Sequence, residues 1–348
     1  MTYFITTPIY YVNDAPHIGH AYTTIACDIL SRYNKLKGDK TFFLTGTDEH
    51  GQKVEKAAFS KKKDTQNFVD EMSQNFRDLI PFLGCQIDDF IRTTEERHKI
   101  ATQFLWNKLK DNDQIYLSNY EGWYSIRDEA FYLESELTKT ENGLIAPSGA
   151  PVEWVKEESY FFKLSQWEDK LLEYYEKNPD SILPRSRYNE VLSFIKGGLK
   201  DLSISRTTFK WGVQVPDTEN HVMYVWIDAL CNYITALNYP NTDHDSFKTF
   251  WPGIHVVGKD ILRFHAVYWP AFLMAAGLEP PKQIFAHGWW TNEGQKISKS
   301  VGNIINPYEI IDTYGLDQIR FFLFREVPFG NDGDFSKDAI AQRVNADL

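Results

Sequence analysis

The sequence YFITTPIYYVNDAPHIGHAYTTIACDILSRYNKLKGDKTFFL, residues 3–44, decides the fold. Its first four residues are β-branched or aromatic and predict a buried strand. A helix is predicted from about His17 to Lys37, because apolar residues recur three or four positions apart on one face; these are Ala21, Ile25, Ile29, Tyr33 and Leu36. Gly38 ends the helix, and residues 41–44 predict a second strand. This strand–helix–strand order predicts a parallel pair with a right-handed crossover, the opening unit of a doubly wound nucleotide-binding sheet.

The rest of the chain repeats this α/β order on both sides of a segment with a different character. Helical patterns fill much of residues 49–110. From about residue 115 to 225, aromatic and β-branched residues alternate with turn signals, which indicates an inserted domain of mixed strands and helices. The remaining predicted elements are two strands, at residues 254–257 and 283–286, and three helices, at 263–276, 307–314 and 316–325. The expected fold is a doubly wound parallel sheet of the Rossmann type, interrupted by an α+β insertion.

These changes divide the 348 residues into four predicted parts. The two halves of the nucleotide-binding domain are expected at residues 1–115 and 226–290. The connective insertion is expected at residues 116–225. Residues 291–348 are expected to hold a basic loop and a helical region. The length agrees with about two domains.

The composition excludes several classes of protein. The formal net charge of −11 argues against a non-specific nucleic-acid binder, which needs a broad basic face, but it allows local contact with RNA. No run approaches the roughly 20 apolar residues of a membrane span, and the first residues lack the basic region of a signal peptide, so a cytoplasmic protein with no membrane partner is expected. Cys27, Cys85 and Cys231 lie far apart without a CxxC pair. They are expected to be buried free thiols rather than disulfides or zinc ligands.

The tetrapeptide His17-Ile18-Gly19-His20 lies where the first loop gives way to the first helix. A helix N-terminus presents unpaired N–H groups and the positive end of the helix dipole, so it attracts phosphate. Two imidazoles there add N–H donors, and Gly19 leaves room for an adenine ring beside the backbone. Taken alone, the four residues could equally be surface histidines beside a helix cap.

A second signal, Lys296-Ile297-Ser298-Lys299-Ser300, follows the last predicted strand. Two ammonium groups on a glycine- and serine-rich segment suit a clamp on ATP phosphates, although an ordinary solvated basic loop has the same composition. In a doubly wound sheet, the segments that follow the strands of both halves open onto one crevice. Two phosphate-binding signals that converge there favour a nucleotide site.

The HIGH tetrapeptide with a downstream KISKS resembles the signature pair of the class I aminoacyl-tRNA synthetases, whose usual second motif is KMSKS. The one difference is Ile297, an apolar exchange for methionine. Within this class, the chain resembles the methionyl-tRNA synthetases over essentially its whole length. Four segments carry the resemblance: residues 7–13, 45–51, 226–233 and 258–265.

The resemblance implies an enzyme that uses ATP, with Mg²⁺ bound to it, to convert methionine into methionyl-adenylate and then transfers methionine to the 3′ end of tRNA(Met). Catalysis is expected to rest on positioning and on stabilising phosphate charge, without a covalent enzyme intermediate. The implied catalytic residues are His17, His20, Lys296 and Lys299. The implied ATP-binding residues are His17, Gly19, His20, Gly258, Asp260, His287, Gly288, Lys296, Ser298 and Lys299. Asp260 would accept hydrogen bonds from the ribose hydroxyls.

The resemblance also implies a methionine pocket. Asp48 is expected to hold the α-ammonium group through a charge-assisted hydrogen bond, where an Asx turn or a cap is the alternative. An apolar, aromatic pocket suits the flexible thioether of methionine, although without the resemblance these residues would be assigned to the core. The implied methionine-binding residues are Pro8, Ile9, Tyr11, Asp48, Trp226, Ala229, Leu230, Tyr233, Ile261, His265 and Trp269.

Two features depart from the family pattern. Many members carry CxxC zinc knuckles in the insertion, whereas residues 116–124 contain no cysteine, so neither a structural zinc nor another protein-bound metal is expected. Members also continue into a helical anticodon-binding domain, and this sequence ends at Leu348, where that domain would begin. With the anticodon-binding domain absent, adenylate formation is expected to be near normal and tRNA charging weak.

Three other functions fit parts of the sequence. A class I synthetase for another amino acid is the nearest, but the leucine, isoleucine and valine enzymes carry larger insertions, and the cysteine enzyme usually needs a zinc site. A catalytically silent paralogue that acts as a binding module would not need both histidines and both lysines of the two motifs. A dinucleotide-dependent oxidoreductase would need a GxGxxG turn after the first strand, which the sequence lacks.

Overall fold

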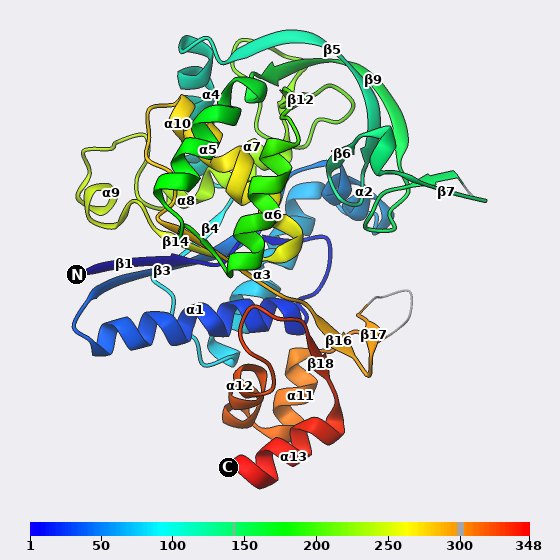
Figure 1. Cartoon of the computed structure of the whole chain (residues 1–348). Coiled ribbons are helices and arrows are strands. Elements are labelled where there is room, and N and C mark those ends of the chain that lie inside the picture. The colour runs from blue at the N-terminus through cyan, green and yellow to red at the C-terminus, as the bar shows by residue number, and fades with distance from the viewer. Residues whose placement is uncertain (142, 298–302) are drawn as a thin grey trace.

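The computed structural model describes residues 1–141, 143–297 and 303–348. A seven-stranded sheet crosses the middle of the molecule, and neighbouring strands in it run parallel (Figure 1). Its strands are β1 (Thr2–Thr6), β2 (Tyr10–Tyr11), β3 (Lys40–Asp48), β4 (Asp89–Arg92), β10 (Ile182–Leu183), β14 (Ile254–Gly258) and β15 (Gln283–His287). The predicted parallel α/β fold is confirmed, together with its four predicted strands.

The strand order determines where a site can form. The order is β10-β15-β14-β1-β3-β2, and β4 also pairs with β3. From β1 the chain goes to β3 on one side and later returns to β14 on the other, so the winding reverses between β1 and β14. Ligands of such sheets bind at the carboxyl ends of the strands beside this reversal. The segments that follow β1, β3, β14 and β15 therefore face one crevice.

Three strands of this sheet were missing from the sequence prediction, because each is only two to four residues long. Strand β4 lies within the stretch expected to be mostly helical. Strand β10 pairs with β15 although it lies within residues 116–225, so the main sheet takes one strand from the range expected for the insertion. The four domain ranges remain a prediction.

Helix α1 (Ile18–Leu36) packs on one face of the sheet, but its buried face differs from the predicted one. Three of the predicted core residues are 39%, 59% and 88% exposed: Ile29, Tyr33 and Leu36. The prediction is wrong there because Asp28 occupies the buried side of the helix. Its Oδ2 accepts a hydrogen bond of 2.7 Å from the guanidinium of Arg320, a half-buried residue, so an ion pair holds the buried carboxylate on this side.

Helices cover both faces of the sheet, with α1 on one face and α5, α6 and α10 on the other (Figure 1). Besides α1, the helices are α2 (Gln52–Ser60), α3 (Thr65–Phe82), α4 (Glu96–Asp111), α5 (Glu168–Lys177), α6 (Arg185–Lys196), α7 (Val225–Leu230), α8 (Asn232–Thr235), α9 (Asp245–Phe250), α10 (Trp269–Ala275), α11 (Pro307–Tyr314), α12 (Leu316–Arg325) and α13 (Lys337–Asp347). Helices α11 and α12 lie where the sequence predicts them.

The helix predicted over residues 263–276 is less regular than expected. Residues Phe264–Tyr268 form a π-helical turn, and α10 begins only at Trp269. Pro270 stands in the first turn of α10, where a missing N–H removes no hydrogen bond of that helix. A π-helical turn inside a helix is often found at a functional site, and this one carries His265.

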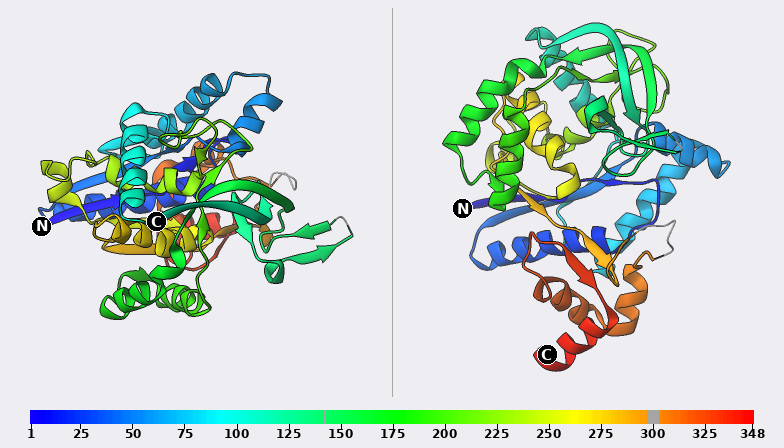
Figure 2. Two further views of the ribbon diagram at one scale, coloured as in Figure 1. Left: turned by 90° about the horizontal axis from the view of Figure 1, so that it is seen from above. Right: turned by 45° about the vertical axis from the view of Figure 1, so that its right-hand side comes forward.

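The insertion is built around a long antiparallel pair, β5 and β9, which curves over the top of the molecule (Figure 1). Its strands are β5 (Ile115–Ser125), β6 (Ala130–Tyr132), β7 (Thr138–Thr140), β8 (Gly143–Ile145), β9 (Glu153–Phe162), β11 (Leu202–Ser203), β12 (Ser205–Arg206) and β13 (Val222–Met223). Figure 2 shows the hairpin of β7 and β8 projecting away from the rest of the molecule.

Residues 290–297 and 303–348 form a small unit on the opposite side of the sheet from the insertion (Figure 1). Strands β16 (Trp290–Asn292), β17 (Gln295–Lys296) and β18 (Gly333–Phe335) make a three-stranded sheet beside α11 to α13. Tyr22 of α1 joins this unit to the nucleotide fold, since its ring contacts Trp290 and stacks on Phe324. Within the described ranges, no helix combines the length and the apolar character needed to cross a membrane.

Candidate active site

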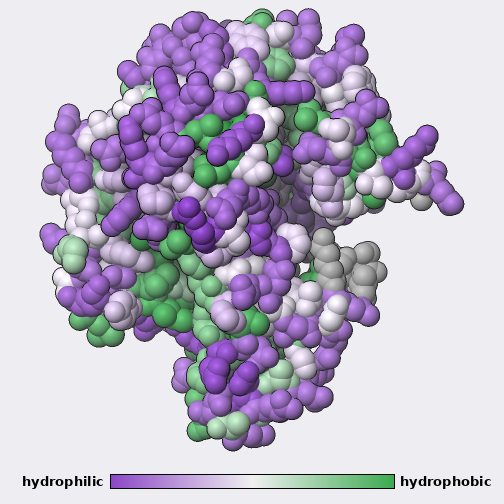
Figure 3. All heavy atoms as spheres, viewed as in Figure 1, coloured by the Kyte–Doolittle hydropathy of each residue, from purple (hydrophilic) through white to green (hydrophobic). Residues whose placement is uncertain are grey.

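A cavity of about 930 Å³ lies at the carboxyl ends of the sheet strands. In the space-filling view, a recess opens between the upper and the lower part of the molecule (Figure 3). The cavity brings together most residues that the sequence analysis singled out. Those that line it are Pro8, Ile9, Tyr11, His17, Gly19, His20, Asp48, Trp226, Ala229, Leu230, Tyr233, Gly258, Asp260, Ile261, His265, His287 and Gly288.

Of the singled-out residues whose side chains the structure describes, one is absent from this lining. Trp269 is fully buried behind the cavity wall, with its ring centre 6.2 Å from that of Tyr233. Ser298 and Lys299 lie outside the described residues. Lys296 belongs to β17, where only its main chain is described, and the next residue, Ile297, lines the cavity.

His17 is the N-cap of α1, and the cap fixes the tautomer of both imidazoles. Nδ1 of His17 accepts the main-chain N–H of Gly19 at 3.1 Å, and Nδ1 of His20 accepts the main-chain N–H of His17 at 3.0 Å. The two bonds form a capping box built from histidines. Because each Nδ1 accepts, each neutral ring carries its proton on Nε2. Among the described residues, no group accepts either Nε2–H, so both donors remain available at the cavity wall.

Burial keeps the two rings neutral. It lowers the pKa of His17 to about 4, against the opposing charge of Asp260. Burial, and next the neighbouring His17, lower the pKa of His20 well below its ordinary value. The ring centres lie 3.9 Å apart, so a proton on one ring disfavours a proton on the other. At pH 7 the pair therefore offers two N–H donors, which suit negative charge that develops on phosphate oxygens.

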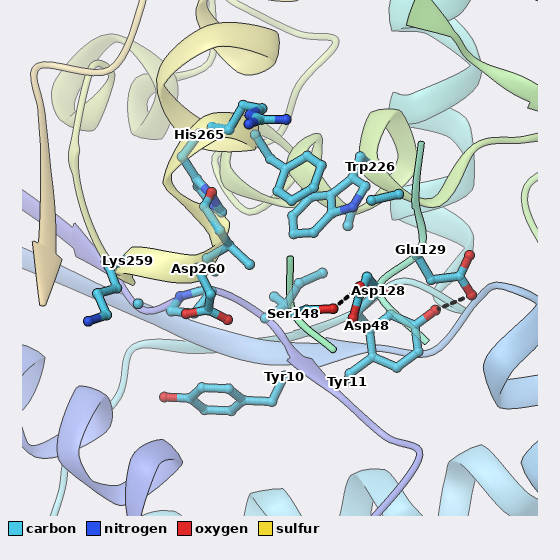
Figure 4. Close-up of a pocket in the computed structure, with 18 of the residues that line it drawn as sticks. Tyr10, Tyr11, Asp48, Asp128, Glu129, Ser148, Trp226, Lys259, Asp260 and His265 are labelled. Atoms are coloured by element: carbon cyan, nitrogen blue, oxygen red, sulfur yellow. Dashed lines mark hydrogen bonds between the residues drawn. The ribbon is translucent and has the colours of Figure 1, made fainter. Parts of the chain in front are cut away.

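The loops after β14 and β15 meet beside these histidines, and two glycines are closely packed there. A Cβ on Gly258 would lie 2.5 Å from Oδ1 of Asp260, and a Cβ on Gly288 would lie 2.3 Å from the main chain of Asn331. The carboxylate of Asp260 is held by a 3.1 Å hydrogen bond from the indole N–H of Trp289 (Figure 4 labels Asp260). This carboxylate is thus fixed at the cavity wall, where it can accept hydrogen bonds from a ligand.

Asp48 ends β3 and is 5% exposed. Its Oδ1 has no hydrogen-bond partner in the described part of the chain. Burial, and next the negative charge of Asp228, raise the pKa of Asp48, whereas the main-chain N–H of His50 lowers it. A buried carboxylate oxygen without a partner destabilises the folded protein. Its position on the cavity wall therefore favours a cationic ligand (Figure 4).

Asp228 of α7 is a second buried carboxylate, and its role was not predicted from the sequence. Its two oxygens accept hydrogen bonds from Nδ1 of His50 and Nε2 of His98, both at 2.7 Å. Burial would raise the pKa of Asp228, but its interactions with His50 and His98 lower it to about 2. These bonds tie α7 to the segment after β3 and to α4. No motif in the sequence marks such a contact, because the three partners are 48 or more residues apart.

Aromatic rings form another wall of the cavity, which is apolar. The rings of Trp226 and Phe264 stack with centres 3.8 Å apart and planes at 4°. Nδ1 of His265 donates to the carbonyl of Ile261 at 2.9 Å, so Nε2 must accept the 2.7 Å hydrogen bond from the Tyr233 hydroxyl. Since these polar atoms bond to one another, the wall presents apolar ring surface. Such a wall suits a polarizable, unbranched side chain.

The neutral His265 ring predicts a loss of stability in acid. Burial lowers its pKa from 6.5 to about 4 in the folded protein, so the unfolded chain takes up the proton first as the pH falls. The contribution is fully present above about pH 6.5 and is lost between about pH 6.5 and 4, by about 3 kcal/mol. Urea unfolding at pH 7 and pH 4.5 measures this loss. His265→Gln should lose less stability over the same range; an equal loss would contradict the assignment.

The cavity also contains charged residues that the sequence analysis did not indicate. The turn between β5 and β6 contributes Arg127, Asp128 and Glu129, and α2 contributes Lys53. Asp128 bonds to the hydroxyl of Ser148, and this pair is drawn with a dashed line in Figure 4. A turn residue in an aromatic-rich strand pair has no motif or periodicity of its own, so only the folded chain places these groups in the site.

Comparisons with known proteins agree with this geometry. The family model described as "tRNA synthetases class I (M)" matches residues 3–348. The methionine–tRNA ligase of Rickettsia conorii is 63% identical over 348 residues, which are 100% of this chain and 68% of that protein. That of Mesorhizobium japonicum is 57% identical over 347 residues, 99% of this chain and 67% of that protein. The chain belongs to the methionyl-tRNA synthetases. The resemblance drawn from the HIGH and KISKS motifs is confirmed.

Two solved structures of Mycobacterium tuberculosis methionyl-tRNA synthetase resemble this synthetase to different degrees. The complex with methionyl-adenylate has a TM-score of 0.98 at 52% identity, over 100% of this chain and 69% of that one. The apo form has a TM-score of 0.83 at 48% identity, over 100% of this chain and 66% of that one. The fold of this synthetase is thus closer to the adenylate-bound form than to the free form.

Proposed function

We infer that the chain activates methionine with ATP to give methionyl-adenylate and transfers the methionyl group to tRNA. One observation carries the inference: a single cavity holds two imidazole N–H donors, a buried carboxylate with one oxygen that no described residue bonds, and an apolar aromatic wall. The donors suit phosphate, the carboxylate suits an ammonium group and the aromatic wall suits a thioether. The chain also shares its fold with a synthetase structure that contains methionyl-adenylate.

The first step is a displacement at phosphorus. A carboxylate oxygen of methionine attacks the α-phosphorus of ATP, a new O–P bond forms, and pyrophosphate leaves with the electrons of the broken P–O bond. Asp48 accepts a hydrogen bond from the α-ammonium group and holds the amino acid for attack. The Nε2–H groups of His17 and His20 donate to phosphate oxygens as negative charge moves toward the leaving group. Lys296 and Lys299 are proposed to neutralise the pyrophosphate.

The remaining contacts to ATP are also proposals. Asp260 would accept hydrogen bonds from the ribose hydroxyls, and Gly258, His287 and Gly288 would lie against the nucleotide. Mg²⁺ would arrive with ATP, bound mainly by phosphates and water. Within the described residues, no three His, Cys, Asp or Glu side chains are grouped so that they could hold a metal ion. The absence of a structural zinc remains a prediction.

In the second step, a hydroxyl of the 3′-terminal adenosine of tRNA(Met) would attack the adenylate carbonyl, and AMP would leave. The cytoplasm is the proposed location, where tRNA and ATP are both present. The enzyme would need no covalent intermediate of its own in either step.

Methionine-dependent exchange of radioactive pyrophosphate into ATP tests the proposed function. We expect exchange with methionine at a rate at least about 10²-fold above that with leucine, isoleucine, valine or cysteine, because one methylene in a fitted apolar pocket discriminates about 10- to 200-fold. Faster exchange with another amino acid would identify a different class I specificity. No exchange with any of them would indicate a binding module without catalytic activity.

A further inference from the structure

Glu129 is a buried carboxylate that the mechanism above does not use. It ends the turn between β5 and β6 in the insertion and is 3% exposed. Its backbone has φ +48°, in the left-handed region that residues with a side chain seldom adopt. Such a conformation persists where the surrounding contacts hold it, and these conformations gather at ligand sites. The contacts of Glu129 therefore indicate what the turn does.

The side chain of Glu129 reaches Tyr11 on β2, at the wall of the methionine pocket. Its Oε1 lies 3.2 Å from the Tyr11 hydroxyl and accepts the main-chain N–H of Lys53 at 3.2 Å (Figure 4). Its Oε2 accepts the hydroxyl of Tyr124. Burial raises the pKa of Glu129, while the bonds from Tyr124 and from Lys53 lower it. Donors on both oxygens fix the carboxylate, so Glu129 can fix Tyr11 in turn.

The main chain of Glu129 reaches the other wall of the pocket. Its carbonyl accepts a 2.5 Å hydrogen bond from the hydroxyl of Tyr224, a fully buried residue. Tyr224 is the N-cap of α7, the helix that carries Trp226 and Ala229. One residue of the insertion thus holds β2 through its side chain and α7 through its main chain.

Gly51 packs closely against the contact between Tyr11 and Glu129. A Cβ on Gly51 would lie 2.5 Å from the Tyr11 hydroxyl and 3.1 Å from Oε1 of Glu129. The hydroxyl also lies 2.9 Å from the main-chain carbonyl of His50. Because the hydroxyl has one proton and two acceptors, removal of Glu129 would leave it bonded to His50 alone. The Tyr11 ring would then be held from the side of His50 only, so its distance from helix α7 could change.

We propose that Glu129 is a positioning residue for methionine: it spans the pocket and sets the distance between Tyr11 and helix α7. The proposal rests on the proposed function, since Tyr11 and the residues of α7 are themselves the proposed methionine contacts. A residue that shapes the pocket equally for substrate and transition state changes the affinity for methionine and leaves turnover unchanged. Through this residue, the insertion determines how well the nucleotide fold binds its amino acid.

Glu129→Ala tests the proposal in the pyrophosphate-exchange assay. We expect the KM for methionine to rise about 10-fold, the effect of one or two lost hydrogen bonds, while kcat and the KM for ATP stay within about twofold. Glu129→Gln keeps one carbonyl oxygen for Tyr11 and for Lys53, so its KM for methionine should stay within about threefold. Equal losses in kcat and in both KM values would indicate a merely structural residue and overturn the proposal.

Tyr11→Phe keeps the proposal testable even if Glu129→Ala does not fold. Relative to the unmodified chain, it should raise the KM for methionine about fivefold. Added to Glu129→Ala, it should raise the KM of that variant by less than about twofold, because both changes break the contact between Tyr11 and Glu129. Tyr188→Phe is the matched control. The hydroxyl of Tyr188 is also buried and donates to the main-chain carbonyl of Tyr175 at 2.8 Å, and Tyr188 lies outside the cavity lining. An unchanged KM in Tyr11→Phe would overturn the proposal.

The two proposals fail in different ways in this experiment. If the unmodified chain shows no exchange with methionine, the proposed function fails before any variant is compared. If the unmodified chain is active and Glu129→Ala behaves like Tyr188→Phe, only the role of Glu129 is wrong.

Discussion

His17→Ala and His20→Ala should each lower the rate of methionine-dependent pyrophosphate exchange about 10²- to 10³-fold, because each removes one preorganised donor from the charge that develops on phosphate. The affinity for methionine should hardly change, since neither ring belongs to the aromatic wall. Exchange rates at saturating substrates, measured beside methionine binding by calorimetry, separate the two effects. The rate should also be flat between pH 6 and 8, because the pKa of His17 is lowered to about 4.

A second capping histidine provides the control for this prediction. His244 is the N-cap of α9, and its Nδ1 accepts the main-chain N–H of Ser246 at 3.2 Å, as His17 does for Gly19. His244 lies outside the cavity lining. His244→Ala therefore removes a helix cap of the same kind, worth about 1 kcal/mol of stability, without touching the site. If His17→Ala slows exchange no more than His244→Ala, the catalytic role of the HIGH histidines is wrong.

Asp48→Asn should weaken methionine binding and strengthen the fold at the same time. The lost hydrogen bond between carboxylate and ammonium contributes about 1.5–3 kcal/mol, so the KM for methionine should rise about 10- to 100-fold. The same change removes a buried charge whose Oδ1 has no partner among the described residues, so the melting temperature should rise by a few degrees. Opposite signs for affinity and stability are the mark of a residue kept for its ligand.

Asp88→Asn is the control, because it makes the same chemical change at a carboxylate that already has a hydrogen-bond partner. Oδ2 of Asp88 accepts the main-chain N–H of Phe43 at 2.8 Å, and the residue is exposed and outside the cavity lining. It should leave the KM for methionine unchanged and should not raise the melting temperature. A lower melting temperature in Asp48→Asn would mean that both oxygens of Asp48 already have partners in the folded protein and that the cationic ligand is misassigned.

The sequence predicted the part of the site that depends on local order along the chain. A strand followed by a helix places the helix N-terminus at the carboxyl end of the sheet, so His17 and His20 could be assigned to the crevice before any contact was known. The family resemblance implied Asp48 and Asp260, and both lie near the carboxyl end of a strand that the sequence predicts. Local patterns failed on α1, where Asp28 faces inward because its ion-pair partner, Arg320, comes from a distant segment.

Only the tertiary structure decided which groups meet across the cavity. Asp228 pairs with His50 and His98, and Glu129 joins Tyr11 to Tyr224, over separations of 95 to 178 residues. Such contacts depend on how the insertion and helix α7 pack on the sheet, and no periodicity or motif encodes that packing. The sequence by itself determined the family, the parallel sheet and the helix cap, because they follow from order and spacing along the chain. The spacing of the pocket walls depends on folding, because it is set by a hydrogen bond between segments that only the packed molecule brings together.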